Sequence, residues 1–87
     1  MEEALVLVWQ EILSARAKGY TALKIIHGCG AIREALPEFL AGRVRFCPGD
    51  KFEVFAPEGR DLVGLCPDLA RDRDYNRHNA GVTLVLL

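Results

Sequence analysis

The last six residues, Val82 to Leu87, read VTLVLL and are apolar at every position except Thr83. A strand without a polar face is usually covered on both sides, so it lies inside a sheet rather than at its edge. A chain of 87 residues suffices for one small domain with a modest core. We therefore expect the C-terminal segment to be the central strand of a single α/β domain that spans residues 1–87.

Two segments show helical periodicity. Residues 2–18 carry apolar side chains at helical spacing, begin with two glutamates and are followed by Gly19, as is typical of a capped helix. Residues 31–40 are also amphipathic, but Pro37 interrupts them. Because proline removes a backbone hydrogen bond from a helix, we expect a kink or a restart at this residue.

Residues 21–26 and 43–47 read as short strands on either side of the second helix. A strand, a helix and a strand in this order predict a right-handed parallel crossover. The motif KFEVF, residues 51–55, can form a further strand. Residues 57–81 are rich in Pro, Asp, Arg and Asn, so we expect a long irregular segment, and loops of this length tend to be functional.

The composition excludes several classes of protein. Eleven Lys and Arg stand against twelve Asp and Glu, so any attraction to nucleic acid must come from a local surface. The three cysteines form no CxxC pair, and reduced thiols in a cytoplasmic protein are the simplest interpretation. The apolar run at residues 4–9 is too short to span a bilayer. We expect no cofactor and no membrane partner.

The motif HGCG, residues 27–30, lies between a predicted strand and a predicted helix. Open amides at a helix start attract anions, and ligands gather at the carboxyl ends of strands. There His27 can bind a phosphate or transfer a proton. The alternative is a tight turn in which Gly28 and Gly30 serve only the backbone, because two glycines are a weak motif.

The charged segment RDRDYNRHNAG, residues 71–81, is a second candidate binding surface. Its basic side chains suit phosphate contacts and its tyrosine suits base stacking. The residues concerned are Arg71, Arg73, Tyr75, Arg77 and His78. The alternative is a solvated loop whose arginines pair with the intervening aspartates.

Cysteine chemistry and metal binding receive little support from the pattern. Cys29 lies beside His27, but no third group that would complete a nucleophilic site can be named. A set of His27, Cys29 and His78 matches no coordination signature, so we predict no metal site.

Three stretches together resemble the Smr domain, the small MutS-related domain: the opening EEAL, the central LKIIHGCGAIREAL and the terminal NAGVTLVLL. The resemblance covers nearly the whole chain and is most specific at residues 21–30 and 81–87. Residues 49–77 resemble a longer-looped branch of that family. The resemblance implies a two-layer α/β sandwich of order β-α-β-α-β-β, like the C-terminal domain of bacterial translation initiation factor three, here without its first strand.

Members of this family bind branched or structured nucleic acid, and several nick DNA or cleave RNA. The resemblance thus implies DNA or RNA as the partner, with His27 as the candidate catalytic group. The residues that it places on or near the functional face are His27, Gly28, Gly30, Asn79, Gly81 and Thr83. We expect Arg33, Arg77 and His78 to add phosphate contacts.

Two departures from the family pattern affect function. The opening strand with its Asp-x-His-Gly motif is absent, and Cys29 stands where lysine is common. One imidazole without a partner group is a weak acid–base site, so binding is the leading expectation and nicking rests on the resemblance alone. The absent strand predicts an open sheet edge, closed by a segment upstream of residue 1 or by a second copy. An interaction module that forms a homodimer is therefore the alternative function, and a binder of small phosphorylated molecules would use the same loop.

Overall fold

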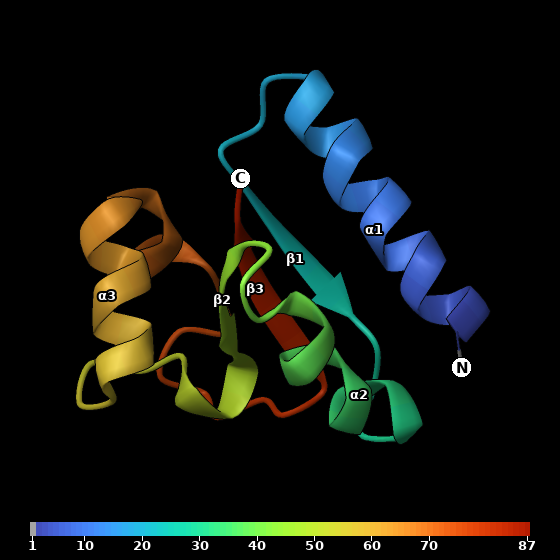
Figure 1. The fold of residues 1–87 in the computed structure, drawn as a ribbon. Helices are drawn as coiled ribbons and strands as arrows, with labels where there is room; N and C mark the ends of the chain where they lie inside the picture. The colour runs from blue at the N-terminus through green and yellow to red at the C-terminus, as the bar shows by residue number, and fades with distance from the viewer. Residues whose placement is uncertain (1) are drawn as a thin grey trace.

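A computed structural model of the protein describes residues 2–87 and places β3, Val82–Leu86, at the centre of a three-stranded sheet (Figure 1). The first four residues of β3 are all buried, which confirms that this apolar strand is covered on both faces. β1, Ala22–Ile26, pairs with one side of β3, and β2, Arg45–Pro48, pairs with the other. The domain is a mixed α/β fold, as expected.

Both strand pairings are antiparallel, so β1 and β2 point in the same direction without being neighbours. The predicted parallel crossover is therefore present, because α2 connects β1 to β2 in the same sheet, but β3 lies between the two strands. Burial explains this order. β3 has no polar face, whereas β1 and β2 keep Lys24 and Arg45 at least partly in contact with solvent.

One face of the sheet is covered by two helices, α1, Glu2–Ala17, and α2, Ala31–Leu40. Their apolar sides meet β3 in a buried cluster that includes Ile12, Leu36 and Val85. α2 is a single helix that continues through Pro37, so the expected restart does not occur. The proline ring is exposed, and the helix ends three residues later, so few hydrogen bonds are lost.

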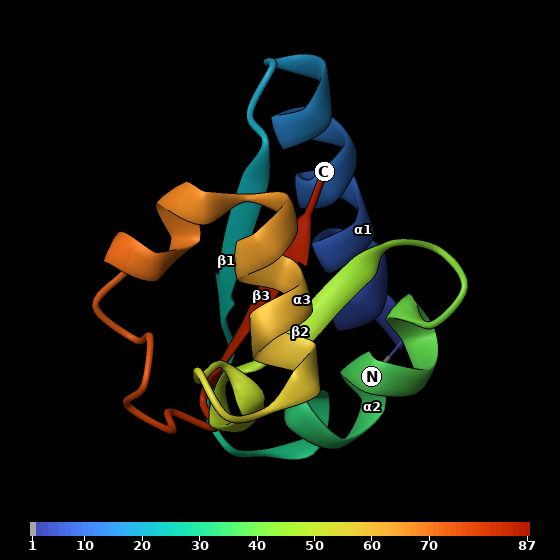
Figure 2. The same cartoon turned by 90° about the vertical axis from the view of Figure 1, so that its left-hand side faces the viewer.

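The opposite face of the sheet is covered by α3, Pro57–Leu65, and a short 3-10 helix, η2, Pro67–Arg71 (Figure 2). The segment 57–81 is therefore helical in its first part rather than irregular throughout. Proline suits the first turn of a helix, but two glycines lower the helical propensity of α3. Tertiary packing of Leu62 and Leu69 supplies the stability that local propensity lacks.

The segment 51–55 is not a strand. A 3-10 helix, η1, Gly49–Lys51, is followed by a series of bends that leads into α3. Phe52 is fully buried, but Val54, which alternation would place on the same face, is 44% exposed, so the pattern does not correspond to a sheet face. The segment lies against α3 so closely that a Cβ at Gly59 would stand 2.5 Å from the backbone nitrogen of Glu53.

Within residues 2–87, none of the helices combines the length and the apolar character that a bilayer crossing requires.

Candidate nucleic-acid interface

The end of β1 and the start of β3 are joined by backbone hydrogen bonds. The backbone amides of His27 and Gly28 both donate to the carbonyl oxygen of Gly81, and each N···O distance is 2.9 Å. Gly28 has a φ of +76°, which L side chains rarely adopt. A Cβ on Gly81 would lie 3.4 Å from the Cα of Gly28. The glycines therefore let the two segments approach closely.

The imidazole of His27 is held by two hydrogen bonds. Nδ1 lies 2.6 Å from the carbonyl oxygen of Gly28, and Nε2 lies 2.9 Å from the hydroxyl of Thr83. Because a carbonyl oxygen only accepts, Nδ1 carries a proton, and in the neutral ring Nε2 accepts from the hydroxyl. Both ring nitrogens are thus engaged within the protein, which orients the loop that precedes α2.

The N-terminus of α2 opens beside this loop. Gly30 is the N-cap residue, and no side chain caps the helix. Gly30 is exposed, and a Cβ at this position would meet no atom within 4 Å, so no other residue packs against the side of the N-cap residue. Arg33 stands in the first turn, and its guanidinium contacts the carboxylates of Glu34 at 3.3 Å and Asp50 at 3.6 Å. Uncapped amides and a nearby guanidinium are the groups that bind anions.

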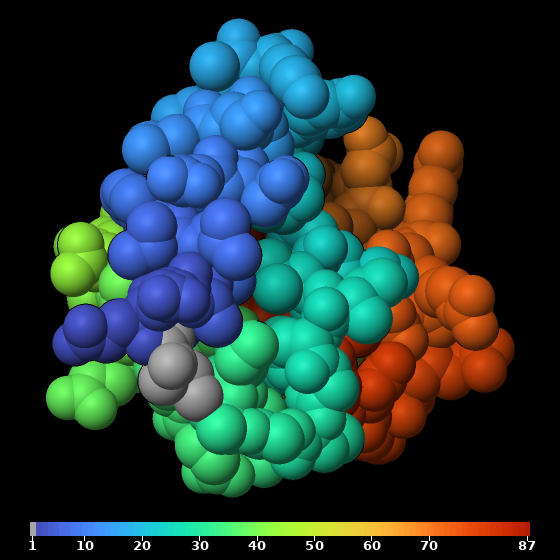
Figure 3. Space-filling model, turned by 90° about the vertical axis from the view of Figure 1, so that its right-hand side faces the viewer, coloured from blue at the N-terminus to red at the C-terminus, as the bar shows by residue number. Residues whose placement is uncertain are grey.

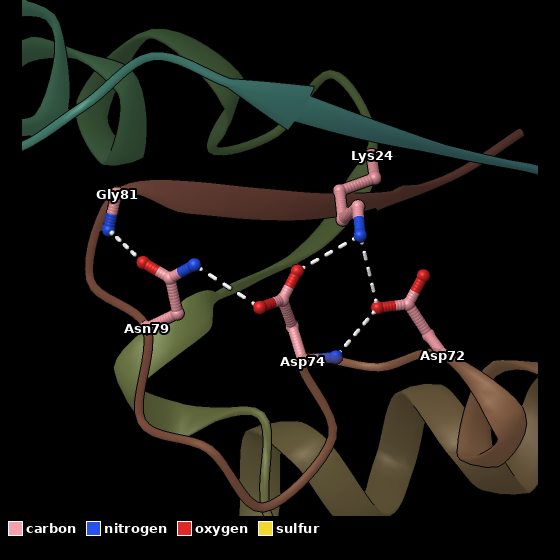
Figure 4. A network of polar contacts seen from close by, with 5 residues as sticks. All are labelled: Lys24, Asp72, Asp74, Asn79 and Gly81. Carbon is pink, nitrogen blue, oxygen red and sulfur yellow. Dashed lines mark hydrogen bonds and ion pairs between the residues drawn. The ribbon is translucent and has the colours of Figure 1, made fainter.

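A network of polar contacts ties the segment 72–81 to β1 (Figure 4). The Lys24 ammonium group donates to Asp72 Oδ1 at 3.1 Å and to Asp74 Oδ2 at 2.8 Å. The second oxygen of Asp74 accepts from the Asn79 amide at 3.0 Å, and Asn79 Oδ1 accepts from the Gly81 backbone amide at 2.9 Å. The network therefore ends at Gly81, whose carbonyl oxygen accepts the hydrogen bonds from the amides of His27 and Gly28.

Asp74 is only 7% exposed, and its charge is retained by its partners. The hydrogen bond from Lys24, with a second from Asn79, lowers the pKa of the Asp74 carboxyl group below its usual value. The hydrogen bond to Asp74 outweighs desolvation and raises the pKa of the Lys24 ammonium group. The pair is therefore ionised over a wide pH range.

His78 does not lie with His27. Its ring contacts the carboxylate of Glu53, and its backbone adopts a φ of +55°. Asn76 also has a positive φ, of +63°. Its backbone amide donates to the carbonyl oxygen of Phe52, and its side-chain oxygen accepts from the backbone amide of Val54. Each of these two distances is 2.9 Å. This half of the segment is thus held against residues 52–54, on the side of α3.

The residues predicted to bind nucleic acid fall into two groups in the structure. The structure brings together His27, Gly28, Asn79, Gly81 and Thr83 through the bonds described above. Arg33 stands on the adjoining first turn of α2, whereas Arg77 is exposed on the same segment as His78.

The aromatic and acidic side chains of the segment 71–81 have structural roles. Tyr75 is partly buried and packs against Phe52 in the core, with ring centroids 5.0 Å apart, so its ring has a structural contact. The aspartates pair with Lys24 on β1 rather than with the neighbouring arginines. The sequence contains no local signal for this pairing, because lysine and aspartate lie about fifty positions apart.

The three cysteines are free thiols in different surroundings. Cys29 is exposed, whereas Cys47 is fully buried and packs in the core. Burial, with a smaller effect of the Glu58 and Asp50 charges, raises the pKa of Cys47 to about 12. Within residues 2–87, no three His, Cys, Asp or Glu side chains are grouped so that they could hold a metal ion.

Thiol labelling is expected to separate these cysteines. With iodoacetamide at pH 8, Cys29 of the native protein should be alkylated rapidly, because it is in contact with solvent. Cys47 should react only after denaturation, because it is buried and about one part in ten thousand of a thiol with this pKa is ionised at pH 8. Peptide mass spectrometry measures both sites, and equal labelling of the two would contradict the packing described.

Comparison of the chain with models of protein families, with curated proteins and with solved structures finds no match in any of the three. The fold and the site therefore define the class of protein by architecture alone. It is an α/β domain with an antiparallel sheet of order β1-β3-β2 and an uncapped helix start beside the carboxyl end of β1. The Smr-like assignment stays a prediction from the residues quoted for it.

Proposed function

We propose that this protein is a cytoplasmic, Smr-like nucleic-acid-binding domain that holds a backbone phosphate of structured DNA or RNA at the His27–Gly30 loop. One observation carries the proposal. Residues 27–28 are hydrogen-bonded to Gly81, and the uncapped start of α2 lies beside this junction at the surface, with Arg33 in its first turn.

The first amides of α2 and the guanidinium of Arg33 form the proposed phosphate-binding site, which we call the phosphate seat. A phosphate oxygen can approach the first amides of α2 because Gly30 has no side chain and the space above it is open. Arg33 has five N–H donors and can add a charge-assisted hydrogen bond to the phosphate while its guanidinium stays near Asp50. The overall charge of −1 adds no attraction, so affinity depends on these local groups.

His27 acts in this proposal as a positioning residue. Its ring bonds hold the Gly28 carbonyl group and Thr83, and so fix the loop that leads to the seat. Nicking of nucleic acid is not part of the proposal, because both ring nitrogens are already engaged and an acid–base role requires one of them to be available.

A charge placed at the N-cap tests the seat. A Gly30→Asp variant should bind a DNA or RNA hairpin at least about tenfold more weakly, because its carboxylate would occupy the anion seat. Its stability should be unchanged or slightly higher, because aspartate caps a helix better than glycine does. Fluorescence anisotropy at 20 to 200 mM salt measures binding, and thermal melting measures stability.

The matched control is Gly30→Ala, which adds a methyl group in open space and leaves the amides uncapped. It should keep most of the affinity. Binding by the wild type should weaken with salt by about one power of ten in affinity per neutralised phosphate per tenfold rise in salt. Equal affinity of Gly30→Asp and wild type would exclude the seat, and no binding at low salt would exclude the function.

The interaction module is the second candidate function, and the free edge of β1 favours it. The hydrogen bond from the His27 amide to the Gly81 carbonyl oxygen shows which residues of β1 are hydrogen-bonded to β3. Hydrogen-bonded pairs alternate along such a ladder, so the main-chain groups of Ala22, Lys24 and Ile26 face away from β3. Unpaired groups of this kind can pair with another strand.

The edge lies in a groove between α1 and β1, and Figure 3 shows β1 at the surface between α1 and the segment that follows η2. Leu7 and Ile26 line the groove and are 62% and 78% exposed. Light scattering tests homodimer formation: a mass of twice the 9.7 kDa of one chain supports it. A monomer at high protein concentration excludes it.

A further inference from the structure

A cavity of about 200 Å³ lies beside the proposed phosphate seat, between the start of α2 and η1. Its walls combine apolar surface from Pro37 and Pro48 with charged groups on the start of α2 and on η1. These charged residues are Arg33, Glu34, Asp50 and Lys51. Thr83 also lines it, and the Thr83 hydroxyl is hydrogen-bonded to the ring of His27. The cavity and the loop that carries the seat therefore share a wall.

The size and lining of the cavity suit one planar group. Pockets for drug-sized ligands usually measure about 300 to 1,000 Å³, so this cavity is large enough for about one base but not for a dinucleotide. Extruded bases bind in snug pockets, where they pack against apolar side chains and expose their pairing edge to polar groups. The two prolines offer such packing surfaces, and the charged groups offer the polar edge.

The ion pair between Arg33 and Asp50 in the cavity is long. Arg33 Nη2 and Asp50 Oδ2 are 3.6 Å apart, longer than the 2.7 to 2.9 Å that is usual for a charge-assisted hydrogen bond. Both side chains are 37% exposed, so neither is sealed in the core. Asp50 presents acceptor oxygens only, and Arg33 presents donors only. A ligand that carries donors and an acceptor side by side would satisfy both.

Guanine has this pattern on its pairing edge. Its N1–H and N2–H groups are adjacent donors that can both reach one carboxylate, and its O6 is an acceptor next to them. Adenine and cytosine offer a single donor group beside an acceptor, and uracil and thymine offer one donor between two acceptors. Only guanine therefore provides two neighbouring donors for the two oxygens of Asp50.

We propose that the cavity is a guanine-reading subsite in which Asp50 accepts from N1–H and N2–H, and Arg33 donates to O6. The nucleotide must be unpaired, because the subsite uses the edge that pairing would cover. This inference rests on the proposed phosphate seat, since the cavity would read a base of the strand that the seat holds. It gives the domain a base preference that phosphate contacts alone do not provide.

The experiment measures the base preference of short single strands. Ten-nucleotide thymidine strands with one central dG, dA or dC, and an all-thymidine strand, are titrated at constant low salt and followed by anisotropy. The strand with dG should bind about tenfold more tightly than the others, as is typical of one bidentate base contact. In Asp50→Asn that preference should fall to about twofold or less.

Asp61→Asn is the matched control, because it removes the same charge from an exposed position on α3, outside the cavity. It should strengthen binding of all four strands slightly and keep the preference for dG. Thermal melting of both variants verifies that they are folded.

The outcomes separate the two proposals. Equal affinity of the wild type for all four strands overturns the guanine subsite and leaves the phosphate seat intact. A preference that persists in Asp50→Asn overturns the assignment of Asp50 as the group that reads guanine. No binding of any strand, together with no binding of hairpins, overturns the seat and the subsite alike.

Discussion

A Gly49→Ala variant is expected to lose about 3 kcal/mol or more of its free energy of unfolding, at the upper end of the usual cost of overpacking. A Cβ at this position would lie 1.9 Å from the backbone oxygen of Asn79, and 2.7 and 2.8 Å from atoms of Val82. Real Cβ atoms essentially never approach so closely, and backbone cannot swing aside as a side chain tip can. The segment that carries Asn79 and Gly81 must therefore move.

Chemical denaturation measures this loss, and for a domain of this size it corresponds to a fall in Tm of at least about 12 °C. Gly64→Ala is the control, because a Cβ there meets no atom within 4 Å. Gly64 lies inside α3, so alanine should stabilise the protein by about 0.5 to 1 kcal/mol. Equal stability of Gly49→Ala and wild type would show that the start of η1 and the segment 79–82 are not packed as described.

A Lys24→Met variant is expected to lose about 2 kcal/mol of stability, the usual cost of removing hydrogen bonds to charged groups. The variant keeps the apolar stem of the side chain but removes both bonds to Asp72 and Asp74. Asp74 would then be a nearly buried carboxylate with only Asn79 as a side-chain partner. Urea denaturation measures the loss, and Lys18→Met, at an exposed position just after α1, should change little.

The pH dependence of the difference between wild type and Lys24→Met follows from the direction of the two pKa shifts. The pKa of Asp74 is lowered in the folded state, so its contribution is present above about pH 4 and disappears as the pH falls through the folded value. The pKa of Lys24 is raised, so its contribution is present below about pH 10 and disappears as the pH rises through the folded value.

The stability difference should therefore be constant between about pH 5 and pH 9 and become smaller at both ends. A double-mutant cycle with Asp74→Asn isolates the pair. The double variant should lose less than the sum of the single losses, because each single change already removes the contact between Lys24 and Asp74. Strict additivity would contradict direct contact between the two side chains.

Much of the fold can be predicted from local pattern. The limits of α1 and α2 agree with the periodicity and the glycine that follows each helix, because an amphipathic face and a cap are properties of neighbouring residues. The region after Pro48 could not be predicted, because α3 has weak propensity and depends on Leu62 being buried by distant residues. Alternation in residues 51–55 resembled a strand, but only Phe52 found a buried site.

The candidate site divides in the same way. The motif HGCG located the loop, because a strand, two glycines and a helix start are local features. The pairing of Lys24 with Asp74, and of His78 with Glu53, joins residues far apart in the chain and has no local signal. The cavity between Arg33 and Asp50 likewise exists only because η1 packs beside the first turn of α2.

The sequence by itself determined that Val82 to Val85 form a buried central strand, because a segment without a polar face is stable only when both of its sides are covered. It also determined that HGCG joins a strand to a helix. Only the tertiary structure decided which residues meet at that junction. These contacts depend on the pairing of β3 with both β1 and β2. They also depend on Gly49 and Gly81, which let their backbone approach that of Asn79 and of Gly28, respectively.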